Sequence, residues 1–255
     1  MLLLLLSGSG MLQAQPGYAL DSNSWKPLVP LFTSRQVVGL GEATHGTKEF
    51  YEQRVALTKF LISQCGFRTI IWETTFWSML AVNDYVAGGP GDPDSLLRNV
   101  GYWMYYTKEI RDLLQWIRAY NTTQQDAEKV QLHGMDIHFA PPPGHDAGNW
   151  QELAEQNRLY TRQLPKKNNE FRDSCMAANV IYILSATQSK GIVWAHNMHI
   201  ARTDTIAGYD RNRMGEWLGR KYGKQYYPIG FFLQSGRFLA IEQRFKDGIP
   251  YYPNF

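Results

Sequence analysis

Four short apolar runs recur along the chain, and an ionisable side chain follows each of them closely. The runs are residues 36–40, 68–72, 129–135 and 191–195, and segments with helical patterns separate them. Short apolar runs that alternate with helices are typical of the buried strands of a mostly parallel sheet. The sequence therefore predicts an α/β fold, in which helices flank a mostly parallel sheet.

The ionisable residues that follow these runs indicate a functional site. They are Glu42 and His45, Glu73, Asp136, and His196. In open α/β sheets, ligands bind outside the carboxyl ends of the strands. Because parallel strands end at the same edge of their sheet, we expect these side chains to converge there.

Helices are expected to fill the gaps between the predicted strands. Residues 47–64 and 171–186 have the length of crossover helices, and residues 107–120 carry their apolar side chains on one face. The last two apolar segments, residues 227–233 and 237–243, are separated by a short turn. They predict a hairpin at the margin of the sheet.

Length and composition favour one globular domain. The chain has 255 residues, of which 44% are hydrophobic and 19% are charged. The net charge of +3 comes from 26 basic and 23 acidic residues, and the sequence has no run of five or more like charges. Such a small and scattered excess does not indicate a nucleic-acid partner.

The two cysteines, Cys65 and Cys175, are predicted to be buried thiols. Both lie in helix-like segments among apolar neighbours, where a free cysteine behaves as a small hydrophobic residue. An exported protein would permit a disulfide between them. Their spacing does not support a cysteine-based metal site.

The first 15 residues have features of a cleaved secretory leader. Leu2 to Leu6 form a short apolar stretch, and Ala14 is a small residue just before a plausible cleavage point. The stretch is too short to span a bilayer, and no cysteine follows it to carry a lipid anchor. We expect residues 1–15 to be a signal peptide and residues 16–255 to form the domain of a periplasmic or secreted protein. Because no Lys or Arg precedes the leucines, a buried or disordered N-terminus is the alternative.

The loop VVGLGEATHG, residues 37–46, allows two interpretations. Its first two glycines fit the G-x-G-x-x-G pattern of dinucleotide-binding proteins, but Thr44 occupies the third position. Glu42 also lies where a pyrophosphate would need positive potential, so it would repel that ligand. The loop is therefore predicted to turn sharply at its glycines, so that Glu42 and His45 point over the sheet edge.

Arg54 lies on the apolar stripe of the predicted helix 47–64, the face that packs against the sheet. A desolvated guanidinium needs an anionic partner. Glu42 and Glu73 are the candidates. The alternative is that Arg54 extends from the edge of the stripe to water.

Two histidines follow the last predicted strand, in the segment VWAHNMHI. A helical turn after His196 would place His199 on the same side. We therefore include both in the predicted site. His133 lies within a strand and His138 and His145 flank a loop, so these three are interpreted as structural or solvent-facing.

In several segments the sequence resembles the erythromycin esterase family. The resemblance begins with GLGEATHGTKEFYEQRVALTKFLISQCGFRTIIWE, residues 39–73. It continues through LHGMDIH (132–138), RDSCMAANV (172–180) and IVWAHNMHI (192–200), and it extends over most of residues 36–233. The G-E-x-x-H-G loop, the helix arginine, the strand-end glutamate and the H-N-x-H pair are specific only as a set.

The resemblance implies a hydrolase that opens esters or lactones with water, without a covalent intermediate, a required metal or another cofactor. It also implies a helical portion over a cleft at the carboxyl ends of the strands. The family's catalytic positions correspond to a loop acid and a histidine proposed as general base, a helix arginine, a second acid and paired histidines. In this chain they are Glu42, His45, Arg54, Glu73, His196 and His199.

Only 35 residues separate Asp136 from Arg172, where the compared members carry a longer helical insertion. A smaller roof predicts a more open cleft and a substrate smaller than a macrolide. We expect Asp136 and the aromatic residues Trp103, Tyr105 and Tyr106 to line this cleft and bind the substrate. Because the chain stops soon after the predicted hairpin, the domain is also expected to be shortened at its C-terminus.

The residue types favour direct attack by water. The sequence has no G-x-S-x-G motif, so a serine nucleophile on an elbow turn is not supported. His45 is predicted to take a proton from water, with Glu42 or Glu73 orienting its ring. Arg54, His196 or His199 would stabilise the developing oxyanion.

Two rivals to this mechanism use the same cluster. His45, Glu73, His196 and His199 include residue types that bind zinc, which would make the protein a metal-dependent hydrolase. A non-catalytic protein that binds haem or another small ligand is the second rival. The predicted partner is a small-molecule ester or lactone, and the sequence predicts no oligomeric state.

Overall fold

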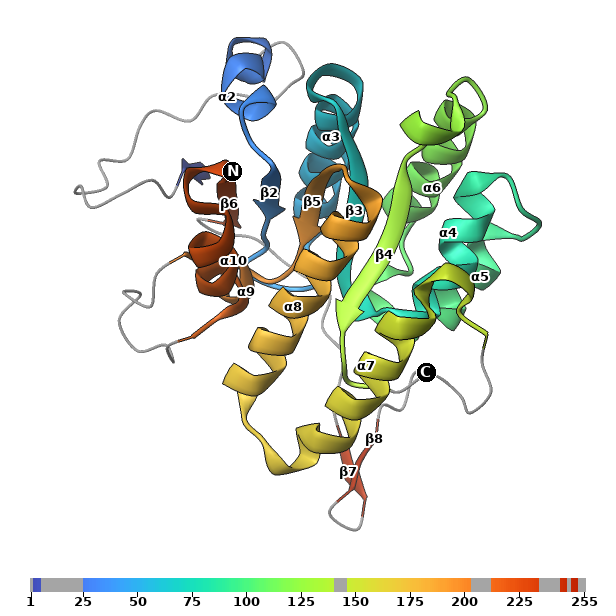
Figure 1. Ribbon diagram of the computed structural model, residues 1–255, viewed down its shortest axis with the longest axis vertical. Helices are drawn as coiled ribbons and strands as arrows, with labels where there is room; N and C mark the ends of the chain where they lie inside the picture. The colour runs from blue at the N-terminus through green and yellow to red at the C-terminus, as the bar shows by residue number, and fades with distance from the viewer. Residues whose placement is uncertain are drawn as a thin grey trace.

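The computed structural model describes residues 2–5, 25–139, 146–202, 212–233, 244–246 and 249–251. Within these ranges the main element is a six-stranded sheet with the order β1-β6-β2-β5-β3-β4 (Figure 1). The strands are β1 (Leu2–Leu5), β2 (Val37–Leu40), β3 (Phe67–Thr75), β4 (Gln131–Asp136), β5 (Lys190–Trp194) and β6 (Tyr226–Phe232).

In this sheet, as far as the chain is described, the five strands from β6 to β4 run parallel and β1 pairs antiparallel with β6. The four apolar runs of the sequence correspond to β2, β3, β4 and β5. The predicted α/β fold with a mostly parallel sheet is therefore confirmed. Two further short strands, β7 (Arg244–Lys246) and β8 (Ile249–Tyr251), pair with each other.

The predicted hairpin at the sheet margin is wrong in its first half. Residues 227–233 largely form β6, which lies between β1 and β2 and pairs in parallel with β2. The chain enters β6 after the helix α10 (Met214–Tyr222) rather than through a tight turn, and such a connection permits parallel pairing. The second half of the predicted hairpin, residues 237–243, lies outside the described residues.

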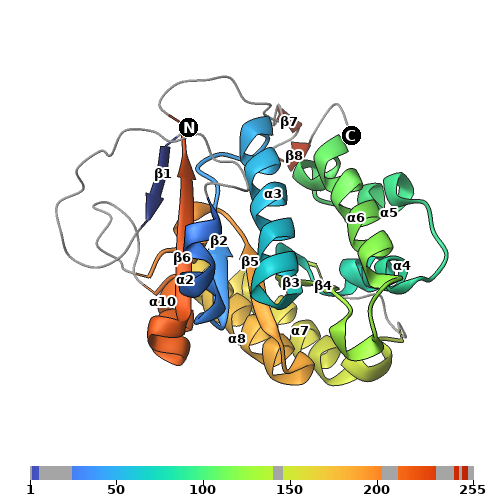
Figure 2. The same ribbon diagram turned by 90° about the horizontal axis from the view of Figure 1, so that it is seen from above.

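Helices cover both faces of the sheet (Figures 1 and 2). One face carries α2 (Val29–Thr33), α3 (Lys48–Cys65), α4 (Leu80–Ala87), α5 (Pro93–Asn99) and α6 (Lys108–Asn121). The other carries α7 (Gln151–Gln163), α8 (Asn169–Thr187), α9 (Asn197–Ile200) and α10. Successive residues of β3 alternate between these layers, since Ile70 and Trp72 pack with the first and Ile71 with the second.

The amphipathic pattern of residues 107–120 corresponds to α6. Its four apolar side chains, Ile110, Leu113, Leu114 and Ile117, are fully buried, as their spacing predicts. Cys65 and Cys175 are buried free thiols, which confirms that prediction.

The glycines of the loop after β2 determine how closely α9 can approach the sheet. A Cβ atom on Gly41 would lie 2.0 Å from Oδ1 of Asn197 and 2.8 Å from Cδ1 of Ile200. Gly46 has a φ of 78°, a conformation that favours glycine. These two positions let the loop and α9 meet above the carboxyl ends of β2 and β5.

The segment predicted to be a signal peptide falls mostly outside the described residues. Leu2–Leu5 form β1, and residues 6–24 are not described. The signal peptide and the periplasmic or secreted location therefore stay predictions. In the described ranges, no helix has both the length and the apolar character needed to cross a membrane.

Candidate active site

His45 and Glu42 form a hydrogen-bonded pair just beyond the carboxyl end of β2. Nδ1 of His45 donates to Oε1 of Glu42 at 2.9 Å, because an ionised carboxylate only accepts. Glu42 is buried, whereas the His45 side chain is 36% exposed. This bond leaves Nε2 of His45 as the nitrogen with a lone pair, on a ring that solvent and ligands can reach.

Arg54 lies beneath this pair on α3 and is fully buried, with Nη1 2.8 Å from Oε2 of Glu42. The two groups are at ion-pair distance without the alignment of a hydrogen bond. The Arg54 guanidinium also lies over the Trp194 ring, 4.2 Å from its centroid. Of the two carboxylates predicted as its partner, Glu42 is therefore the one that Arg54 contacts, and the alternative of a solvent-facing Arg54 is wrong.

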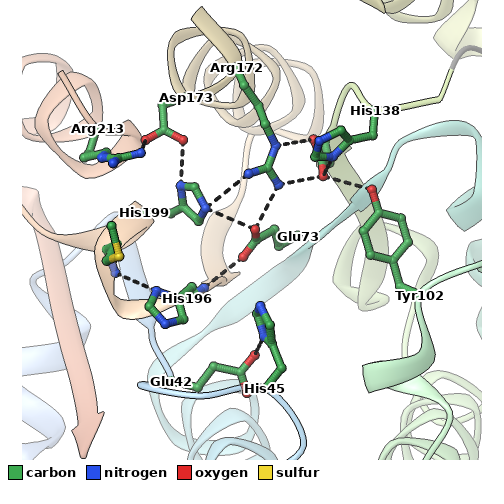
Figure 3. A network of polar contacts seen from close by, with 12 residues as sticks. Glu42, His45, Glu73, Tyr102, His138, Arg172, Asp173, His196, His199 and Arg213 are labelled. Carbon is green, nitrogen blue, oxygen red and sulfur yellow. Dashed lines mark hydrogen bonds and ion pairs between the residues drawn. The ribbon is translucent and has the colours of Figure 1, made fainter. Parts of the chain in front are cut away.

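A second and larger polar network surrounds Glu73 on β3 (Figure 3). One carboxylate oxygen, Oε1, accepts a hydrogen bond from Nη2 of Arg172 at 2.9 Å and lies 3.2 Å from Nε2 of His199. The other, Oε2, accepts from the backbone N–H of His196 at 2.9 Å. Burial alone would raise the pKa of Glu73, but His199 and Arg172 together hold it well below the ordinary value.

His199 lies between two buried carboxylates. Its Nε2 faces Glu73, and its Nδ1 is 2.6 Å from Oδ1 of Asp173 on α8. Burial favours the neutral ring, yet the two carboxylates outweigh it and raise the pKa of His199 to about 9. His199 is therefore an imidazolium at neutral pH.

Asp136 at the end of β4 accepts hydrogen bonds at both oxygens. Arg172 donates from Nε to Oδ1 at 2.9 Å and from Nη2 to Oδ2 at 2.8 Å. The Tyr102 hydroxyl and Nδ1 of His138 each donate to Oδ2, both at 2.9 Å. Although burial opposes ionisation, His138 and Arg172 hold the pKa of Asp136 well below its usual range.

Among the described residues, the charges of this network balance. Three buried carboxylates, from Glu73, Asp136 and Asp173, face three cations. The cations are Arg172, His199 and Arg213, whose Nη1 is 3.4 Å from Oδ2 of Asp173. Arg172 and His199 approach each other at 3.2 Å despite their like charges, because each also contacts carboxylates.

His196 joins the two groups of residues. Its Nε2 donates to the carbonyl of Ala43 at 2.9 Å, so its Nδ1 is free to accept from the N–H of Met198 at 3.2 Å. Its ring lies edge-on to that of His45, with centroids 5.6 Å apart. Burial is the main cause of its lowered pKa. His196 is thus a neutral ring with both nitrogens occupied, which caps α9 and holds the loop after β2.

The sheet edge brings together most of the predicted site residues. Glu42, His45 and Arg54 form one group, and Glu73, His199 and Asp136 belong to the second, with His196 between them. The role of the three predicted aromatic residues in substrate binding stays a prediction. Tyr105 is buried and stacks on Trp72 with ring centroids 4.9 Å apart, and Trp103 packs against the core. Tyr106 is 42% exposed and its hydroxyl accepts from Arg98 at 2.6 Å.

Sequence reasoning missed five members of the network: Tyr102, His138, Arg172, Asp173 and Arg213. A signal for Arg172 and Asp173 was present. A crossover helix runs antiparallel to the strands, so the first turn of the predicted helix 171–186 must lie at their carboxyl ends. An Arg-Asp pair in that turn therefore points to the site. His138, interpreted as structural or solvent-facing, is partly exposed and bonded to Asp136; His133 is buried in β4, and His145 lies outside the described residues.

Among the described residues, no group of three or more His, Cys, Asp or Glu side chains is arranged to hold a metal ion. The aligned contacts of the cluster instead join carboxylates to arginine and imidazole groups.

The sequence profile of a family described as Erythromycin esterase matches residues 62–148 and 144–249, which together are most of the chain. The match includes Glu73, Asp136, Arg172 and the pair His196 and His199. It begins after the loop that carries Glu42 and His45. The geometry of that loop is therefore an observation independent of the profile.

Individual proteins show the same similarity. Erythromycin esterase type II of Escherichia coli is 33% identical over 115 residues, which are 45% of this chain and 26% of that relative. A crystal structure of a Bacillus cereus protein has a TM-score of 0.68 at 24% identity, over 82% of this chain and 68% of that one. The open conformation of a variant of erythromycin esterase EreC has a TM-score of 0.59 at 20% identity, over 82% and 73%. The two structures support the fold, and the segment aligned to the curated relative spans about a quarter of its length.

Proposed function

Because this chain belongs to the erythromycin esterase family, we propose that it hydrolyses a carboxylic ester or lactone by general-base activation of water. The observation that carries the proposal is the contact between a partly exposed His45 and a buried Glu42. The name of the Escherichia coli relative supports the same reaction class.

His45 is the proposed base. Its Nδ1–H is fixed on Glu42, so the lone pair of Nε2 is available to accept a proton from water. The resulting hydroxide oxygen attacks the carbonyl carbon, and the proton held on Nε2 is then given to the departing alcohol oxygen. Glu42 stabilises the imidazolium that forms between these two steps.

Arg54 acts through Glu42 rather than on the substrate. It is fully buried below the carboxylate, and its ring partner Trp194 is buried as well. A buried carboxylate without a counter-charge would become protonated or move to water. Arg54 thereby keeps Glu42 negatively charged and in place beneath the imidazole.

The larger network supplies the positive charge for the developing oxyanion. His199 is an imidazolium, and Arg172 uses Nε and Nη2 on the carboxylates. Its Nη1 lies 3.2 Å from Nε2 of His199 and makes no hydrogen bond to a carboxylate in the described part of the chain. We assign the oxyanion to these two cations. His196 is less suited to that role, because its ring is neutral, with Nε2 donating to the carbonyl of Ala43 and Nδ1 accepting from the N–H of Met198.

The substrate is proposed to be smaller than a macrolide or less enclosed. The segment between Asp136 and Arg172 carries α7 as its main helix, and this segment is short. A short covering segment leaves more of the substrate in solvent, so fewer contacts distinguish large substrates from small ones.

An ester panel that includes simple aryl and alkyl esters and a macrolactone tests this function, run with and without a chelator. We expect turnover of simple esters that a chelator does not reduce. His45→Gln should retain the folded circular-dichroism spectrum and lose roughly a hundredfold or more in kcat/KM. Near-normal kcat/KM in the folded variant would show that His45 is not the base. Activity lost to the chelator and restored by zinc would instead support the metal-dependent alternative.

A further inference from the structure

The site contains a second imidazole in the same setting as His45. Nδ1 of His138 donates to the buried Asp136 at 2.9 Å, as Nδ1 of His45 donates to the buried Glu42 at 2.9 Å. An arginine neutralises each carboxylate, Arg172 in the first case and Arg54 in the second. The His–carboxylate–arginine arrangement therefore occurs twice at the same sheet edge.

His138 presents its other nitrogen to the exterior. Its side chain is 44% exposed, compared with 36% for His45. Because Nδ1 is held as a donor to Asp136, Nε2 of the neutral ring is an acceptor. Within the described ranges Nε2 makes no hydrogen bond, so it can accept one from a ligand.

The spacing of the strands decides what His138 can do. The sheet order places β5 and β3 between β2 and β4. Neighbouring strands lie about 4.8 Å apart, so the strand ends that carry the two imidazoles are about 14 Å apart. Figure 3 shows Glu73, Arg172 and Tyr102 in the region between them. We therefore assign His138 to a part of the substrate remote from the bond that His45 hydrolyses.

The surroundings of His138 are aromatic. Phe139 is 58% exposed, and its ring lies 6.4 Å from that of Tyr102 and 6.4 Å from that of His138. The Tyr102 hydroxyl is already used on Asp136. The local surface thus combines one free polar acceptor with an apolar ring, a composition that fits a hydroxyl group on an apolar carbon frame.

We propose that His138 and Phe139 form a substrate subsite, which binds a hydroxyl-bearing apolar portion of the ester remote from the cleaved bond. That the bound molecule is an ester rests on the proposed function. Nε2 of His138 accepts the hydrogen bond from the hydroxyl, and Phe139 contacts the carbon frame. Asp136 is the positioning residue that fixes the ring of His138.

A series of ω-hydroxyalkyl esters with alcohol chains of increasing length tests the subsite, each paired with its ω-methyl analogue. We expect the hydroxylated ester to have the lower KM only in the longer members, by about threefold to tenfold, the range of one net hydrogen bond. His138→Phe keeps a planar ring without either nitrogen and should abolish this difference, so that the two members of each pair have the same KM. His138→Gln keeps a polar group and should retain part of the preference. Phe139→Ala should raise KM for both members of a pair.

Two outcomes overturn the subsite: no preference for the hydroxyl at any chain length, or a preference that persists in His138→Phe. Failure of the proposed function is a separate result, since it would appear as no turnover of any ester. In that case calorimetric titration of the same esters gives the hydroxyl preference as a ratio of dissociation constants. The subsite is then supported or rejected by the effect of His138→Phe on that ratio.

Discussion

Arg172 and Asp136 meet in a two-point ion pair, with Nε 2.9 Å from Oδ1 and Nη2 2.8 Å from Oδ2. The pair joins the first turn of α8 to the end of β4, and Nη2 also donates to Glu73 on β3. One guanidinium therefore neutralises two buried carboxylates on neighbouring strands. Without it, the two negative charges would repel each other in a region that water barely reaches.

Replacing Arg172 should destabilise the protein strongly. We expect Arg172→Met to lower the free energy of unfolding by about 3–5 kcal/mol, the usual cost of leaving a buried charge unpaired. Arg172→Lys keeps the charge but not the planar fork, so its effect should be intermediate. Denaturant unfolding measures both, with the exposed Arg98→Met as a control whose change should stay within about 0.5 kcal/mol. An equally small change for Arg172→Met would show that Glu73 and Asp136 can lose their counter-charge without lowering the free energy of unfolding.

Stability should fall on the alkaline side because of His199. The pKa of His199 is raised to about 9 in the folded protein. Because the pKa is higher in the folded protein than in the unfolded chain, the protonation of His199 stabilises the fold. This contribution is complete below the unfolded-state pKa of about 6.5 and is lost as the pH rises through about 9. The loss should reach at most about 3 kcal/mol. Unfolding measured from pH 6 to 10 gives the profile, and His199→Gln should flatten it between these two values.

The acid side should show the opposite dependence. The pKa values of Glu73 and Asp136 are lowered in the folded protein, so their contribution is present above the ordinary carboxyl range and lost below it. Stability should therefore decline as the pH falls below about 4. A profile that is flat from pH 6 to pH 2 would contradict the ionised state of this network.

Arg54 and Lys59 offer a matched comparison on one helix. Arg54 is buried against Glu42, whereas Lys59 lies over the Trp116 ring at the surface of α3, 5.4 Å from the centroid. Arg54→Leu should reduce kcat/KM at least about tenfold, because Glu42 would lose its counter-charge and would no longer orient the His45 ring as a carboxylate. Lys59→Leu should change stability by less than about 1 kcal/mol and leave kcat/KM unaltered. If both variants show the same small effects, Glu42 does not depend on Arg54.

Gly41 is expected to tolerate no side chain. A Cβ there would meet Asn197 and Ile200, so Gly41→Ala should push α9 away and cost about 1–3 kcal/mol. It should also reduce activity, since α9 carries His199. Gly219→Ala is the control, because this glycine lies within α10 and a Cβ would contact only the flexible side chain of Arg202 at 3.3 Å. That substitution should stabilise the helix by about 0.5–1 kcal/mol. Thermal unfolding of the two variants should thus shift in opposite directions.

The parts of the site that follow from local pattern could be predicted from the sequence. An apolar run predicts a buried strand, and the end of that strand predicts which residues lie at the sheet edge. The apolar stripe of residues 47–64 predicts the buried face of α3. These rules place Glu42, Glu73 and Asp136 at one edge and put Arg54 on the buried face of α3, whereas the choice of Glu42 over Glu73 as its partner comes from the structure. They act over a few residues, so no knowledge of long-range packing is needed.

Pairing between distant segments could not be predicted in the same way. Arg172 contacts both Glu73 and Asp136, and the local pattern around it shows only the first turn of a helix. The choice among neighbouring aromatic residues is a second case. In the short 3-10 helix Trp103–Tyr105 the Tyr105 side chain is buried, and the preceding Tyr102 donates its hydroxyl to Asp136. So short a helix has no sequence periodicity from which the direction of each aromatic side chain could be predicted.

The balanced charges at the sheet edge also bear on how the chain reaches its folded state during synthesis. Glu73 and Asp136 emerge from the ribosome before α8 and α9 supply Arg172 and His199. Until then, β3 and β4 cannot bury their carboxyl ends without burying unpaired negative charge. We therefore expect the β3–β4 edge to remain hydrated in a nascent chain and to close only after α9 has been made, so that the site is among the last regions to exclude water.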